Sequence, residues 1–118
     1  SIFGSDFDTI DGSGVRDYVH VEDIVDAHII AIKKINQFNG NVYNIGNSSG
    51  FSVHEIIKEA ENIFSKKAKI KVKNRRKGDP AILVAKCELI EKDFSWTPKK
   101  TLSEMLITSF DWRNNPSY

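Results

Sequence analysis

The chain has 118 residues, a formal net charge of +1 and a single cysteine, Cys87. This length suits one small domain with a modest core. A net charge so close to zero excludes a general attraction to nucleic acid or to anionic membranes. The lone cysteine excludes an internal disulfide framework and fits a reducing, cytoplasmic compartment. The sequence has no apolar run of about eighteen residues and no signal-peptide pattern, so we expect neither a membrane span nor secretion.

A glycine-punctuated turn, residues 11–14, leads into a segment of alternating residue types, 15–21. The alternation predicts a strand with one buried face, because successive side chains of a strand point to opposite sides. The buried face carries Val15, Asp17, Val19 and Val21, and the opposite face carries Arg16, Tyr18 and His20. A guanidinium beside such a turn suits a phosphate or carboxylate, since it donates two parallel hydrogen bonds. The alternative is that Arg16 only pairs with a neighbouring acid.

A helix and a short strand are predicted next. Asp23 can cap a helix over residues 24–35. Apolar residues occupy most of the circumference of this helix, so we expect it to be largely buried. A turn at Gly40 and Asn41 then leads to a strand over residues 42–45.

The middle of the chain carries a second helix. Ser52 and Glu55 form a capping box, and an apolar stripe of helical spacing follows as far as Phe64. Residues 69–74 alternate apolar residues with lysines, which predicts a strand exposed on one face.

The last third of the chain reads as helical. A short helix is expected around residues 87–93, with Cys87 serving only for packing. Thr101 and Glu104 form a second capping box, which begins a terminal helix through Trp112. The predicted fold class is therefore α/β, a small helical cluster with short strands.

The loop at residues 75–80 is a second candidate for chemistry. Gly78 permits a sharp turn, and Pro80 biases Asp79 toward an extended backbone. An arginine and an aspartate held a few residues apart suit a nucleoside diphosphate. The arginine binds phosphate oxygens and the aspartate accepts hydrogen bonds from ribose hydroxyls.

Eight of the twelve residues from Lys66 to Lys77 are basic. Such a run can form a nucleic-acid patch, but lysines also keep the exposed side of an edge strand from pairing. We favour the second interpretation, because no aromatic residue for base stacking is interleaved in the run. The three histidines have no spacing typical of a zinc site, so we expect no metal.

Four segments in the same order resemble the C-terminal region of UDP-glucose 4-epimerases, NAD-dependent isomerases of galactose metabolism in the extended short-chain dehydrogenase/reductase superfamily. The resemblance covers essentially the whole chain and is specific in combination. The segments are 3–21, with FGSDF and DGSGVRDYVHV, 42–46 (VYNIG), 75–81 (RRKGDPA) and 91–98 (EKDFSWTP).

The resemblance implies a UDP-sugar site. Residues matching Arg16 and Arg76 hold the diphosphate in the family, the residue matching Asp79 binds the ribose, and the loop of Ile2 and Phe3 packs on the uracil. Alternation would point Arg75 away from Arg76, so we expect it to face solvent.

The other half of such an enzyme has no counterpart in this sequence. No glycine-rich dinucleotide fingerprint joins a strand to a helix, and no tyrosine is followed four residues later by lysine. We therefore expect residues 1–118 to form a single C-terminal nucleotide-sugar-binding domain without its Rossmann domain. NAD serves the full-length family. For this chain alone we expect no cofactor, no catalytic residue, no epimerase activity and weak UDP-sugar binding.

Two alternatives remain at this level. The chain could belong to a related nucleotide-sugar dehydratase, decarboxylase or uronate epimerase, since the same arginines and aspartate would serve all of these. It could also be a non-enzymatic basic interaction module. The apolar helix at residues 24–35 needs more cover than 118 residues supply, so we also expect self-association or docking of the missing N-terminal half.

Overall fold

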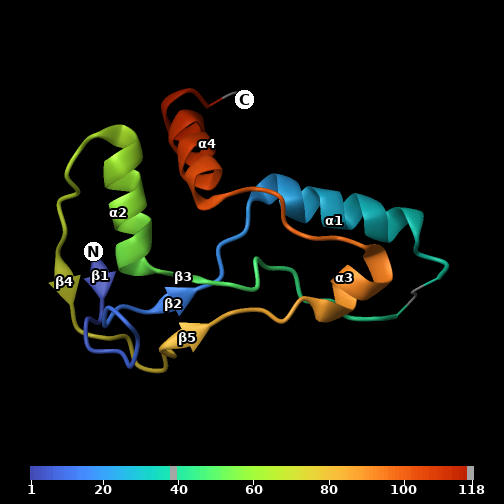
Figure 1. Cartoon of the computed structure of the whole chain (residues 1–118), viewed down its shortest axis with the longest axis horizontal. Helices are drawn as coiled ribbons and strands as arrows, with labels where there is room; N and C mark the ends of the chain where they lie inside the picture. The colour runs from blue at the N-terminus through green and yellow to red at the C-terminus, as the bar shows by residue number, and fades with distance from the viewer. Residues whose placement is uncertain (38–39, 117–118) are drawn as a thin grey trace.

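A computed structural model describes residues 1–37 and 40–116 of the chain. Short strands gather toward one end of the molecule, with helices beside them and further helices toward the other end (Figure 1). The elements are β1 (Ile2–Phe3), β2 (Val15–Arg16), α1 (Val21–Lys33), β3 (Phe51–Ser52), α2 (Val53–Phe64), β4 (Val72–Lys73), β5 (Ile82–Leu83), α3 (Glu88–Phe94) and α4 (Leu102–Asn114). The predicted α/β class, a helical cluster with short strands, is confirmed.

The strands form two small sheets that join distant parts of the sequence. In the first, β2 lies between antiparallel β3 and parallel β5, so that Val15 is opposite both Ser52 and Ile82. In the second, β1 pairs with β4 in parallel, and Phe3 lies opposite Lys73. These pairings place the loop between β4 and β5, residues 74–81, close to the glycine-rich turn.

The predicted strand over residues 15–21 is much shorter than expected. Only Val15 and Arg16 pair with neighbouring strands, and the segment then runs to α1 without a ladder. Val21 is 66% exposed, whereas His20 is buried. The prediction of a buried valine face opposite His20 was therefore wrong. Among the described residues, β3 and β5 each pair with only two residues of β2, so the alternating pattern is not continued as a strand.

The first helix begins before the predicted cap. His20 is the N-cap residue: its Nδ1 accepts a hydrogen bond from the Glu22 N–H at 3.0 Å, and its Nε2 lies 2.8 Å from the Thr108 hydroxyl. Asp23 lies instead in the first turn, where it is buried. Its carboxylate accepts hydrogen bonds from the backbone N–H groups of residues 99 and 100, both at 3.1 Å. Asp23 thus fixes the approach to α4.

The expectation that α1 is largely buried was wrong. Only Asp23 and Ala27 of this helix are buried. The described part of the chain packs α3 against one side of α1 and leaves an apolar stripe on the other side open. The stripe consists of Val21, Val25, Ile29 and Ile32.

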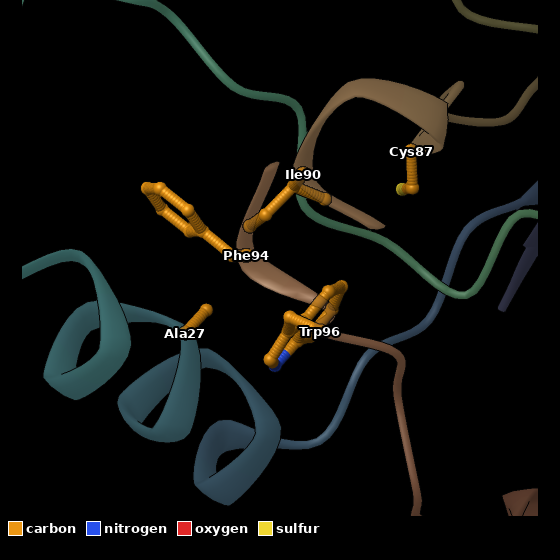
Figure 2. Packing of buried hydrophobic residues seen from close by; sticks show 5 residues of the cluster. All are labelled: Ala27, Cys87, Ile90, Phe94 and Trp96. Atoms are coloured by element: carbon orange, nitrogen blue, oxygen red, sulfur yellow. The ribbon is translucent and has the colours of Figure 1, made fainter. Parts of the chain in front are cut away.

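The main core lies between α1 and α3. Figure 2 shows Ile90, Phe94 and Trp96 gathered over Ala27 of α1, with Cys87 at the edge of the cluster. The Trp96 indole N–H donates a hydrogen bond to the Asp23 carbonyl at 3.1 Å. Burying each of the large apolar side chains contributes roughly 1.5–3 kcal/mol. The predicted short helix at residues 87–93 and the packing role of Cys87 are consistent with this cluster.

A second contact, between α2 and α4, closes the other side of the molecule. The rings of Phe64 and Phe110 lie 4.4 Å apart at this contact. Both predicted capping boxes are confirmed, since Ser52 and Thr101 each exchange hydrogen bonds with the glutamate three residues later.

Two predicted strands differ from the structure. Residues 42–45 are in no strand, because no backbone in the described part of the chain pairs with them. Within residues 69–74 only Val72–Lys73 forms a strand, β4, and it is exposed on both faces.

The molecule is open and flat, with extents of 49 × 36 × 22 Å and a radius of gyration of 16.7 Å. A compact chain of this length would have a radius of gyration of about 13.5 Å. None of the described helices has the length and apolar character needed to cross a membrane.

Candidate functional site

A cavity of about 330 Å³ is lined by residues of β1, the glycine-rich turn, the start of α2 and the loop after β4. Figure 1 shows where these elements lie. All four predicted site residues, Phe3, Arg16, Arg76 and Asp79, line this one cavity. Its other lining residues are Ser1, Ile2, Phe7, Gly14, Tyr18 and Val53. Of the strand face predicted to carry Arg16, Tyr18 and His20, the first two reach the cavity, whereas His20 turns away to cap α1.

The Arg16 side chain is fixed by backbone oxygens. Its Nη1 donates a hydrogen bond to the Val15 carbonyl at 2.7 Å and approaches the Ala81 carbonyl at 3.5 Å. A side chain at position 14 would place its Cβ 3.0 Å from this nitrogen, so Gly14 leaves the room that the guanidinium occupies. Within residues 1–37 and 40–116, Arg16 forms no ion pair. The alternative that it only pairs with an acid is therefore not supported.

Arg76 and Asp79 face each other across the turn after β4. The Arg76 Nε lies 3.8 Å from an Asp79 carboxylate oxygen, and 65% of the Arg76 side chain is exposed. The Arg76 guanidinium also lies over the Phe3 ring, 4.2 Å from its centroid. Two guanidinium groups and one carboxylate thus share the cavity with an aromatic ring, and the surplus of positive charge favours an anion.

The Arg75 side chain is 41% exposed, in line with the expectation that it faces solvent, but it also has partners in the loop before β2. Its Nε donates a hydrogen bond to an Asp6 carboxylate oxygen at 2.6 Å, and a second guanidinium nitrogen donates to the Asp6 carbonyl. The guanidinium lies 4.2 Å from the centroid of the Phe7 ring. The hydrogen bond from Arg75 is the main cause that lowers the pKa of the Asp6 carboxyl. Alternation thus predicted the exposure of Arg75 but not its contacts with Asp6 and Phe7.

Asp11 ties the glycine-rich turn to α2. One carboxylate oxygen accepts hydrogen bonds from the Ser13 N–H at 2.9 Å and the Ser13 hydroxyl at 2.7 Å, and the other accepts from the Ser52 hydroxyl. Burial acts to raise the pKa of Asp11, but the hydrogen bonds from Ser52 and Ser13 outweigh it, so this pKa lies below its usual value. Ser13 is completely buried, which leaves the turn little freedom next to Arg16.

Asp17 is a positioning residue that the sequence did not reveal. Its carboxylate accepts hydrogen bonds from the N–H groups of Asn47 at 2.6 Å, Ala85 at 2.9 Å and Ser48 at 3.3 Å. It thereby joins the end of β2 to two segments that are distant in sequence. The available signal was its place on the predicted valine face, because a carboxylate directed inward needs several donors.

The chain is similar to several known proteins. The sequence profile of the NAD dependent epimerase/dehydratase family matches residues 2–46. Human UDP-glucose 4-epimerase is 39% identical over 119 residues, covering 99% of this chain and 34% of the human protein. The crystal structure of UDP-glucose 4-epimerase from Bifidobacterium longum in complex with NAD⁺ and UDP superposes with a TM-score of 0.89 and 37% identity. That match covers 96% of this chain and 34% of the other.

The chain is therefore similar to the NAD-dependent epimerase/dehydratase family. Within it, the sequence and the structure match UDP-glucose 4-epimerases over about a third of their length. A UDP-glucuronic acid 4-epimerase from Bacillus cereus, in complex with UDP-glucuronic acid and NAD, is also similar, with a TM-score of 0.83 at 26% identity over 96% of this chain and 34% of that chain.

The epimerase/dehydratase family is named for NAD, but the residues of this chain do not fit that cofactor. A dinucleotide fingerprint follows a strand and opens a helix, so that the helix N-terminus meets the pyrophosphate. Here Gly12 and Gly14 precede β2, and the loop from Gly46 to Gly50 leads into β3. In the described part of the chain, no group of three or more histidine, cysteine, aspartate or glutamate side chains could hold a metal ion.

Proposed function

We propose that this chain is the nucleotide-sugar-binding part of a UDP-glucose 4-epimerase, an NAD-dependent enzyme that interconverts UDP-glucose and UDP-galactose. The observation that carries the proposal is the single cavity lined by Phe3, Arg16, Arg76 and Asp79. These residues come from three separate segments of the chain. Their meeting around one space is what a bound nucleoside diphosphate requires.

Each residue has a role that its chemistry supports. Arg16 and Arg76 donate charged hydrogen bonds to the diphosphate, Asp79 accepts from the ribose hydroxyls, and the Phe3 ring packs on the uracil. The cavity of about 330 Å³ lies at the lower end of the usual range for small-molecule pockets. We therefore propose that it holds the nucleotide part of the substrate.

Epimerisation needs groups that these residues do not supply. The chain has neither a dinucleotide fingerprint nor a Tyr-x-x-x-Lys pair. We propose that residues 1–118 form one binding domain and that a Rossmann domain, corresponding to the N-terminal half of the relatives, supplies NAD and the catalytic base. The complete enzyme would work in the cytoplasm, where the lone Cys87 stays reduced. This chain alone is predicted to have no epimerase activity.

A UDP titration with two variants tests the site. Wild-type protein should bind UDP with a dissociation constant in the high micromolar to millimolar range. Contacts from the proposed Rossmann domain are lost, whereas the entropy cost of ordering a flexible diphosphate remains. Arg16→Ala and Arg76→Ala should each weaken binding about tenfold or more, since charged hydrogen bonds contribute roughly 1.5–3 kcal/mol. Lys77→Ala, a change of an exposed cation in the same loop, is the control.

Submicromolar binding that neither arginine variant reduces would contradict this assignment of the site. Equal losses in the Lys77→Ala control would show that only the general positive charge matters. Either result would favour the basic interaction module, whose affinity for DNA should fall steeply with salt.

A uronate epimerase is the second candidate, because the Bacillus cereus UDP-glucuronic acid 4-epimerase shares the fold of this chain at 26% identity. The human UDP-glucose 4-epimerase, at 39%, is more similar. The four site residues contact the nucleotide, which both substrates share. Only contacts with the sugar can therefore separate the two candidates. In competition against labelled UDP we expect UDP-glucose to compete better than UDP-glucuronic acid, and the reverse order would favour the uronate epimerase.

A further inference from the structure

Two adjacent arginines in the loop after β4 are held in different ways. Arg75 makes three contacts, with the Asp6 carboxylate, the Asp6 carbonyl and the Phe7 ring. Arg76 makes one loose ion pair at 3.8 Å and one ring contact, and its side chain is more exposed, at 65% against 41%. One guanidinium is therefore anchored, while its neighbour remains available for a ligand.

The Arg75 contacts join the two walls of the cavity. Phe7, under the Arg75 guanidinium, is buried and lines the cavity itself. The chain turns sharply at Gly4, where φ is +87°, and a Cβ there would lie 2.6 Å from the Phe7 ring and 2.7 Å from the Arg75 side chain. The loop of residues 4–12 is thus pressed against Arg75 with no space for an additional side chain.

The segment that carries Arg76 and Asp79 is held at both ends. At its far end the Val15 N–H donates a hydrogen bond to the Ala81 carbonyl at 2.8 Å, just before β5 pairs with β2. The Gly4 N–H donates a hydrogen bond to the Lys73 carbonyl at 2.9 Å, which is the last pairing between β1 and β4. Beyond Lys73, Arg75 links the loop after β4 to Asp6 and Phe7. The next residue, Arg76, lines the cavity. An isolated surface ion pair would contribute little. Here a two-pronged fork and ring stacking act together, which is the geometry that favours arginine over lysine.

We propose that Arg75 is a positioning residue for the nucleotide site. By clamping Asp6 and Phe7 it fixes the loop from which Arg76 reaches the diphosphate and Asp79 reaches the ribose. This inference rests on the proposed function, because it assigns a role to Arg75 in binding the same ligand.

The test uses three variants of the full chain. Arg75→Met removes the fork and the charge but keeps an apolar stem over Phe7. Arg75→Lys keeps a cation there and loses the fork, and it gives the same comparison if Arg75→Met does not fold. Lys77→Met is the matched control, since it removes an exposed cation two residues away. For each protein the UDP dissociation constant and the unfolding midpoint in urea are measured.

A spectroscopic readout separates positioning from general stability. The Arg76 guanidinium lies over the Phe3 ring, so the NMR shift of its Nε–H proton without ligand reports how the group is placed. We expect Arg75→Met to move this signal toward the value of a free arginine and to weaken UDP binding about fivefold. Arg75→Lys should lie between Arg75→Met and the wild type, and Lys77→Met should change neither quantity.

The outcomes distinguish this inference from the proposed function. Unchanged UDP affinity in Arg75→Met, or reduced affinity with an unmoved Arg76 signal, would overturn the positioning role and leave the site assignment intact. If wild-type protein bound no UDP, the proposed function would fail, and the role of Arg75 in nucleotide binding would fail with it.

Discussion

At Gly14 a single methyl group can test the placement of Arg16. A Cβ at this position would lie 3.0–3.3 Å from the guanidinium atoms, which is tight but involves only the far end of a flexible side chain. Gly14→Ala should therefore fold normally, displace the Arg16 guanidinium and weaken UDP binding about fivefold. The measurement is a UDP titration of the wild type and Gly14→Ala.

The double variant supplies the control. If Gly14→Ala acts through Arg16, adding it to Arg16→Ala should cause no further loss of affinity, because the group it displaces is absent. An unchanged affinity in the single variant, or a full additional loss in the double variant, would contradict the role of Gly14.

The site residues differ in how well the sequence could predict them. Arg16, Arg76 and Asp79 were predicted because their motifs resemble those of a known family, and the structure places all three around one cavity. The Arg75 contact could not be predicted, since Asp6 lies 69 positions away in the sequence. The contacts of Asp17 could not be predicted either, because its backbone donors come from distant segments.

At the scale of elements, the hydrogen bonds of Asp11 join the glycine-rich turn to the N-terminus of α2, and they predict a dependence on pH. The folded-state pKa of Asp11 lies below its usual value of about 4. The stabilisation from this carboxylate is therefore complete above that value and is lost as the pH falls through the folded-state pKa. We expect the free energy of unfolding to decrease below about pH 5.

Asp11→Asn tests this assignment. The variant should be less stable at neutral pH, and its stability should fall less steeply in acid, because one of the linked protonations is absent. Asp8→Asn, which changes an exposed carboxylate of the same loop, serves as the control. Urea unfolding at a series of pH values measures both effects, and parallel curves for wild type and Asp11→Asn would contradict the assignment.

Local signals predicted the helices better than the strands. The capping boxes at Ser52 and Thr101 are complete within four residues of sequence, and both are present. The strands depend on partners from elsewhere: β2 needs β5, and β1 needs β4. The sequence of residues 42–45 favours an extended backbone. The described part of the chain offers them no strand to pair with, so the predicted strand does not form.

At the scale of the whole molecule, the open stripe on α1 predicts self-association. Val25 is 50% and Ile29 43% exposed, and both belong to a continuous apolar face. Such faces favour association. We expect the wild type to form a dimer or larger soluble species at high concentration in sedimentation velocity. The combined variant Val25→Lys and Ile29→Lys should be monomeric.

Ile10→Lys is the matched control, because Ile10 is fully exposed but lies on a loop away from α1. It should associate like the wild type. A wild-type protein that remains a monodisperse monomer at high concentration would contradict this use of the α1 face. Equal dissociation by the control would show that added charge, rather than the stripe, decides the outcome.

The central claim is that the cavity between β1, β2 and the loop after β4 binds a UDP-sugar. The most direct measurement is a UDP titration followed by backbone NMR shifts, with UDP-glucose and a short DNA duplex as comparators. We predict saturable shifts clustered at Phe3, Arg16, Arg76 and Asp79 with UDP and UDP-glucose. No response to UDP, together with salt-sensitive shifts across residues 66–77 with DNA, would contradict the claim.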